Sequence, residues 1–123
     1  MPRRARVRLA IQLFLCRFFE LMKEVELKSI AERAGRAAAA EAVYLFGSRA
    51  TGLAREDSDF DFALILDDDA DPWRATLEAQ RALWPREFSV DIAPISKRAW
   101  LTSKDFFVES IRRDGRLLYA SDG

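Results

Sequence analysis

The hydrophobic pattern along the chain predicts several short strands. Residues 42–46 (AVYLF) and 60–66 (FDFALIL) are apolar runs of the length expected for buried strands. Residues 87–93 (EFSVDIA) alternate enough to predict a third strand, and 117–119 are expected to form a short extended tail. The chain therefore offers enough strands for one small sheet.

Helices are predicted between these strands. Residues 27–40 are rich in Ala, Glu, Lys and Arg, although Gly35 weakens this helix and is a candidate break. A second helix over 72–83 begins with proline, which suits a first helical turn, and Asp71 is its expected N-cap. A last helix is predicted over 104–113. Strands separated by helices favour a sheet covered by helices.

A separate helix is predicted near the N-terminus. Arg17 and Glu20 interrupt its apolar stretch and no small-residue cleavage site follows, which argues against a secretory signal. The stretch is also too short and too charged to span a membrane, so no membrane association is expected. A helix apolar around so much of its girth is usually buried on more than one side. Core packing and contact with a partner, including a second copy of this chain, both remain open. The apolar residues of one helical stripe are Val7, Ile11, Phe14, Leu15, Phe18, Met22 and Val25.

Composition narrows the range of functions. The length of 123 residues indicates a single domain over 1–123, and equal numbers of acidic and basic residues argue against a basic surface for nucleic acid. Because the chain has no histidine, it cannot use a Ser-His-Asp triad or a histidine-ligated metal. Cys16 is the one cysteine and is expected to pack as a small core residue. Nothing requires an oxidising compartment, so we expect a cytoplasmic protein.

Charge is unevenly distributed, and residues 56–71 hold eight acidic side chains and no basic one. A solvated loop is one interpretation of such a run, and a metal site is the other. Asp59 and Asp61 are two residues apart at the start of a predicted strand, so their side chains lie on the same face. Two adjacent carboxylates repel each other, and a divalent cation such as Mg²⁺ removes that cost.

Asp91 is a candidate third carboxylate on another strand. It lies between Val90 and Ile92, and an aspartate within an apolar strand is rarely there for packing. The alternative is an ion pair with an arginine such as Arg49 or Arg98. Two metal ions held by such carboxylates could clamp an in-line phosphoryl transfer.

The turn after the first predicted strand contains Gly47 and Ser48. Glycine allows the backbone to approach a ligand closely, and backbone amides at the start of a helix favour phosphate. The pair is common in turns and is weak evidence alone.

Together these motifs resemble the minimal nucleotidyltransferases of the DNA polymerase β-like superfamily, whose signature is Gly-Ser, a spacer, Asp-x-Asp and a later third Asp. The resemblance implies an α+β nucleotidyltransferase fold with a small mixed sheet covered by helices. Its catalytic core would span 41–95, and 1–25 would be an N-terminal helical extension. The matching runs are Gly47-Ser48-Arg49-Ala50-Thr51-Gly52, Asp57-Ser58-Asp59-Phe60-Asp61 and Val90-Asp91-Ile92.

The resemblance also implies roles for individual residues. Gly47 and Ser48 would hold the triphosphate, and Arg49 is close enough in sequence to touch phosphate. Three aspartates would be catalytic metal ligands, with two Mg²⁺ ions as cofactors and ATP as substrate, and the third of them would assist deprotonation of the attacking hydroxyl. These aspartates are Asp59, Asp61 and Asp91.

The short chain resembles the antitoxin branch of this family, which is encoded beside a HEPN-domain RNase toxin. The resemblance implies that the antitoxin binds the toxin and transfers AMP to one of its tyrosines. Two alternatives stay open: an antitoxin that neutralises its partner by binding alone, and nucleotidyl transfer to a nucleic acid or small molecule. The four arginines within 1–8 are the only feature that favours a nucleic acid.

Overall fold

The structure is a computed structural model, which describes residues 3–47, 50, 60–85 and 89–122. Three predicted site residues, Ser48, Arg49 and Asp59, lie outside this described part. The elements in chain order are α1 (Arg3–Ala37), β1 (Ala42–Phe46), β2 (Phe60–Leu66), α3 (Pro72–Ala82), β3 (Val90–Ser96), α4 (Lys97–Thr102), α5 (Phe106–Asp114) and β4 (Arg116–Ala120).

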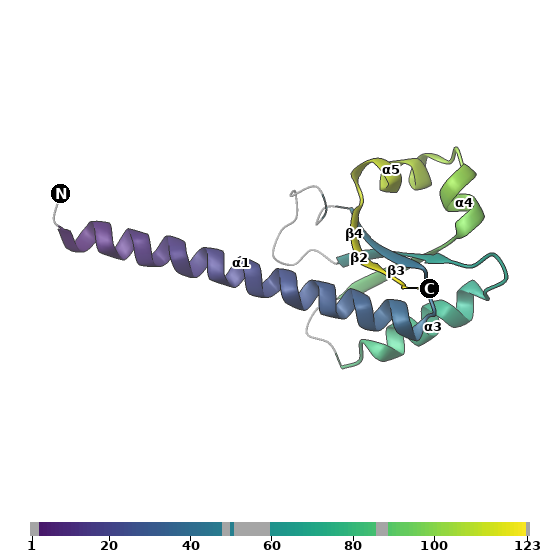
Figure 1. Ribbon diagram of the computed structural model, residues 1–123, viewed down its shortest axis with the longest axis horizontal. Helices are drawn as coiled ribbons and strands as arrows, with labels where there is room; N and C mark the ends of the chain where they lie inside the picture. Colours follow the sequence, from purple (N-terminus) through teal and green to yellow (C-terminus); the bar gives the residue numbers. More distant parts are fainter. Residues whose placement is uncertain (1–2, 48–49, 51–59, 86–88, 123) are drawn as a thin grey trace.

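The four strands form one mixed sheet in the order β3-β2-β1-β4. Strand β1 is antiparallel to both β2 and β4, whereas β2 and β3 are parallel and are joined through α3. Helices α1 and α3 cover one face of the sheet, and α4 and α5 cover the other (Figure 1). This arrangement confirms the predicted α+β class with a small helix-covered mixed sheet.

Both faces of β2 are buried, which explains its almost continuous apolar sequence. Phe62 and Leu64 pack against α1 and α3, while Ala63 and Ile65 point to the α4 and α5 side. All five residues from Phe62 to Leu66 are buried. The packing on both faces of β2 thus fixes the position of Asp61 near the start of this strand.

The N-terminal half of the chain differs from the prediction of two helices, because α1 is one continuous helix. Gly35 does not break it. A Cβ at Gly35 would lie 2.5 Å from Cδ1 of Tyr119 and 3.0 Å from Cγ2 of Val43, so glycine lets the sheet approach the helix closely. Tertiary packing explains this glycine, and that contact is invisible in local sequence.

The first part of α1 projects from the body (Figure 1). The large apolar side chains that the structure describes there are exposed rather than buried on more than one side, from 45% at Leu15 to 68% at Phe14. The side chains of Cys16, Phe18 and Met22 lie outside the described part. Core residues of α1 begin at Leu27. We call residues 3–26 the arm.

The C-terminal third contains three differences from the sequence prediction. The helix expected over 104–113 is α5, which begins at Phe106, and α4 precedes it as an additional short helix capped by Ser96. The expected tail at 117–119 is β4, which pairs with β1 inside the sheet. Strand β3 continues to Ser96 through Pro94, which is tolerated because β3 is at the edge of the sheet.

Candidate functional site

The parallel pairing of β2 and β3 places two of the predicted carboxylates side by side. Asp61 and Asp91 are direct partners in the register of these strands. Paired residues of neighbouring strands point to the same face, and neighbouring strands are about 4.8 Å apart. Both side chains therefore lie on the face that α4 and α5 cover farther along the strands.

The end of β1 completes this corner of the sheet. Phe46 pairs with Asp61, and Gly47 follows directly. Gly47 has a φ of +74°, and a Cβ built on it would lie only 2.4 Å from Oδ2 of Asp61. Glycine is thus required here for two reasons, the left-handed backbone and the close approach of that backbone to a carboxylate.

Aromatic side chains flank the carboxylates on the same face. The Phe46 and Phe107 rings meet edge to face with centroids 5.4 Å apart, and Tyr44 contacts Trp100 at 4.6 Å. Local sequence does not predict the contact of Phe46 with Phe107, because β1 and α5 are distant in sequence. The available signal was the helical spacing of the buried residues Val108 and Ile111 in α5.

Helix α3 holds β3 in position. Its N-cap is Asp71, as predicted, whose Oδ1 accepts from the amides of Trp73 at 3.0 Å and Arg74 at 3.4 Å. Farther along, Nε2 of Gln80 donates to the carbonyl of Val90 at 3.1 Å. This bond ties α3 to the residue immediately before Asp91.

The proposed arginine partner of Asp91 is not observed. Asp91 is exposed, and within the described part of the chain it forms no ion pair. The amide of Arg98 instead donates to Oδ1 of Asp68 at 2.9 Å. Arg49, the other arginine named as a partner, is outside the described residues. Among the described residues, therefore, no basic side chain neutralises the carboxylate of Asp91 in place of a metal ion.

The paired carboxylates fit a magnesium ion by their chemistry. Mg²⁺ is typically bound by one or two carboxylates together with substrate phosphates. Asp61 and Asp91 supply carboxylate oxygen donors on one face, and the backbone of Gly47 lies close against the Asp61 carboxylate. No group of three acidic or cysteine side chains suited to a metal occurs among the described residues, which do not include Asp59.

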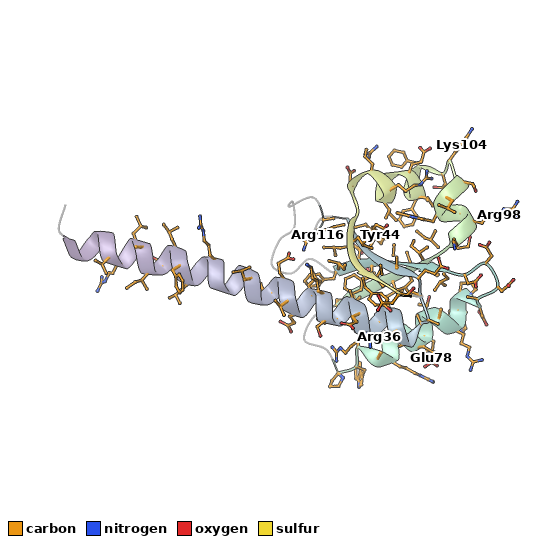
Figure 2. All side chains as sticks on the ribbon, in the orientation of Figure 1. Arg36, Tyr44, Glu78, Arg98, Lys104 and Arg116 are labelled. Carbon is orange, nitrogen blue, oxygen red and sulfur yellow. The ribbon has the colours of Figure 1, made fainter. Side chains whose placement is uncertain are left out.

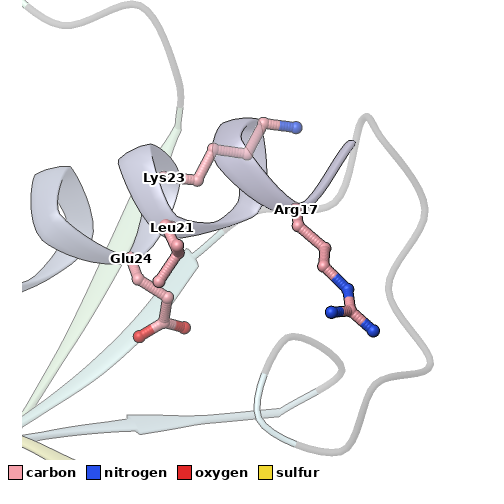
Figure 3. Close-up of a pocket in the computed structure, with 4 residues that line it drawn as sticks. All are labelled: Arg17, Leu21, Lys23 and Glu24. Atoms are coloured by element: carbon pink, nitrogen blue, oxygen red, sulfur yellow. The ribbon is translucent and has the colours of Figure 1, made fainter. Parts of the chain in front are cut away.

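A hollow of about 560 Å³ lies along α1, where the arm leaves the body (Figure 3). The described residues that line it, all from α1, are Arg17, Leu21, Lys23 and Glu24. Neither Asp61 nor Asp91 is among them, so this hollow is separate from the carboxylate pair.

The fold and this corner define an α+β domain with aspartates gathered at one end of a mixed sheet. The sequence pattern of the family Polymerase beta, Nucleotidyltransferase matches residues 26–123. The chain therefore belongs to the polymerase β nucleotidyltransferase family. The first residue of this match is the last residue of the arm.

Solved structures share this fold. A toxin-antitoxin crystallised with AMP-PNP has 20% sequence identity and a TM-score of 0.58, over 77% of this chain and 74% of that chain. A protein from Sulfolobus solfataricus assigned as a nucleotidyltransferase has 18% identity and a TM-score of 0.55, over 83% and 87%. A mutant of the toxin-antitoxin MntA-HpeT has 16% identity and a TM-score of 0.53, over 80% and 74%. At these identities the likeness establishes the fold.

No curated protein matches the chain in sequence. Across the residues that the structure describes, no helix combines the length and the apolar character needed to cross a membrane.

Proposed function

We propose that this chain is a Mg²⁺-dependent nucleotidyltransferase that moves AMP from ATP to a hydroxyl of a partner protein, a tyrosine of a HEPN-domain toxin, and thereby acts as an antitoxin. The observation that carries the proposal is the alignment of Asp61 with Asp91 beside Gly47. Family membership supports nucleotidyl transfer as the class of reaction.

Each site residue has a role in this proposal. Asp61 and Asp91, together with Asp59, would hold two Mg²⁺ ions, and Gly47, Ser48 and Arg49 would contact the triphosphate. The bound ions would neutralise charge on the phosphates.

In the transfer, the acceptor oxygen forms a bond to the α-phosphorus, while the bond from that phosphorus to the oxygen of pyrophosphate breaks. The carboxylate of Asp91 would accept the proton of the attacking hydroxyl. Because Asp91 is exposed, an acceptor can reach it from outside.

Two observations support a protein partner. Related folds occur in toxin-antitoxin structures, one of them with AMP-PNP, an ATP analogue. In addition, the arm leaves the body at the site end of the sheet. Glu24 near the end of the arm pairs with Arg116, which is labelled in Figure 2. Arg116 pairs with Leu45 in the sheet, and the next residue of β1 pairs with Asp61. A protein that contacts the arm would therefore stand near the carboxylates.

The test is co-expression with the protein encoded next to this chain, followed by intact-mass measurement of the co-purified partner. We expect added AMP units that disappear with Asp61→Asn and with Asp91→Asn. Asp69→Asn is the matched control, because it removes an exposed carboxylate from the acidic turn outside the site and should leave the added mass unchanged. Added mass that persists in both site variants contradicts the assignment.

A second candidate is an antitoxin that neutralises its partner by binding alone. The exposed apolar arm favours it, because such a surface can bind a protein without any chemistry. A stable complex that carries no added mass, and that forms equally well with Asp61→Asn, would favour this second function over transfer.

A further inference from the structure

Six apolar residues of the arm follow a heptad pattern. Val7, Ile11, Phe14, Phe18, Leu21 and Val25 are separated in turn by four, three, four, three and four residues. This alternation is the a and d spacing of a two-stranded coiled coil. Of these, Val7, Ile11, Phe14, Leu21 and Val25 are between 54% and 68% exposed. We call these six heptad positions the seam.

The seam lies on the side of α1 away from the core residues of this helix, and Leu21, near the end of the seam, also lines the hollow beside α1. At about 100° per residue, the seam positions cluster on one side of the helix, while the core residues Leu27, Ile30, Ala31 and Ala34 cluster on the other. A second helix could thus lie along the seam without meeting the sheet or α3. Figure 1 shows the arm clear of the body over this length.

We propose that the seam is a dimer interface, in which the arms of two copies of this chain pair as an antiparallel coiled coil. The proposal does not depend on the proposed transferase function. Over 24 residues the arm is about 36 Å long, close to the shortest heptad run that indicates a coiled coil. The dimer is therefore expected to dissociate in the micromolar range.

Charge selects the antiparallel direction. Residues 3–8 hold four arginines and no acid, whereas 20–26 hold three glutamates and one lysine. Parallel arms would bring four arginines against four, which is unfavourable. Antiparallel arms with Val7 opposite Val25 of the second copy bring each arginine-rich end beside the acidic segment. Glu24 already pairs with Arg116, and the other acids of this segment are Glu20 and Glu26.

The same alignment keeps the two bodies apart. When position 7 faces position 25, position 3 faces position 29, so the paired stretch ends where the core residues of α1 begin. The two bodies then lie at opposite ends of the paired arms. A partner protein or a lipid surface on the seam is an alternative occupant, and the experiment below distinguishes both from a second copy.

The first experiment is analytical ultracentrifugation of the full chain over micromolar concentrations. We expect a monomer–dimer equilibrium, and Phe14→Glu should raise the dissociation constant at least about 100-fold, because it buries an unpaired charge in the seam. Leu13→Glu is the matched control. Leu13 is 59% exposed, close to the 68% of Phe14, but it lies off the seam, so the dissociation constant should change little.

The second experiment tests direction by disulfide cross-linking in a Cys16→Ser background. Antiparallel arms predict that Val7→Cys cross-links to Val25→Cys when the two variants are mixed, and that neither variant cross-links efficiently to itself. Self-linking of Val7→Cys indicates parallel arms and overturns the proposal.

A monomer at every concentration also overturns the proposal. In that case, loss of the co-expressed partner with Phe14→Glu would identify that partner as the occupant, and sedimentation with anionic vesicles would identify a lipid surface.

Discussion

Gly47→Ala is expected to reduce nucleotidyl transfer far more than it reduces stability. The added Cβ would lie 2.4 Å from Oδ2 of Asp61, well inside an ordinary contact of at least about 3.4 Å. The carboxylate must therefore move by about 1 Å or rotate away. A displacement of that size at a reacting centre can cost about 100-fold in rate.

The same substitution has a second, backbone cost. Gly47 has a φ of +74°, where an alanine is less favourable than glycine by about 1–2 kcal/mol. The two costs can be separated with Gly47→Asn. Asparagine tolerates positive φ but carries a Cβ, so this variant should regain much of the stability and little of the activity.

Gly115→Ala provides a control that affects folding only. Its Cβ would lie 2.4 Å from the carbonyl oxygen of Ile111 at the end of α5, and its three nearest atoms all belong to Ile111 rather than to Asp61 or Asp91. Such overpacking typically destabilises by about 1–3 kcal/mol. Transfer measured well below the unfolding temperature should be unchanged in this variant.

The assay combines urea unfolding with a timed measurement of AMP added to the co-expressed partner. Full activity of Gly47→Ala at a temperature where it is folded would contradict a requirement for glycine at this position, because a Cβ would then be compatible with catalysis by Asp61. Full recovery of activity in Gly47→Asn would refute the steric part alone, and would assign the loss to backbone conformation.

Three further predictions concern the sheet and its helices. Asp91→Asn should raise the free energy of unfolding without Mg²⁺ by up to about 1 kcal/mol, because it removes a like-charged neighbour of Asp61. It should also abolish the rise in melting temperature that Mg²⁺ with AMP-PNP gives the wild type, measured by differential scanning calorimetry, and an unchanged rise would count against the site. Gly35→Ala gains about 1 kcal/mol of helix propensity but forces a Cβ into the ring of Tyr119. Urea unfolding should therefore show a net loss of about 1–2 kcal/mol in the free energy of unfolding, and a gain when the same substitution is made in a Tyr119→Ala background. Asp71→Ala should lose about 1 kcal/mol in the same assay, because the amides of the first turn of α3 lose their acceptor, whereas Asp71→Asn should retain most of it.

Local sequence patterns were sufficient to predict the elements that are marked by an apolar run or a capping residue. Strands β1 and β2 and the capped start of α3 were predicted at the residues where the structure has them, because apolar runs and a capping residue are local signals. The continuity of α1 was not predictable in this way. Gly35 lies against the ring of Tyr119, on the face of the sheet that α1 covers, and these two residues are far apart in sequence.

The candidate site was predictable in part for a similar reason. An aspartate between Val90 and Ile92 is conspicuous in an apolar strand, and the structure pairs it with Asp61. The distance from Gly47 to that carboxylate and the aromatic contact of Phe46 with Phe107 required the three-dimensional arrangement. The roles of Ser48, Arg49 and Asp59 stay predictions from sequence.

The hydrogen bond from Gln80 of α3 to the carbonyl of Val90 links the helix between β2 and β3 to the position of Asp91. Strand side chains alternate between faces, so a slip of β3 by one residue would turn Asp91 toward α3 and set an apolar neighbour beside Asp61. The length and position of α3 therefore determine on which face of the sheet the carboxylate of Asp91 lies. Insertions or deletions between β2 and β3 should consequently inactivate the site while leaving a folded sheet, whereas the exposed side chain of Asp69 in the turn before α3 can change without that effect.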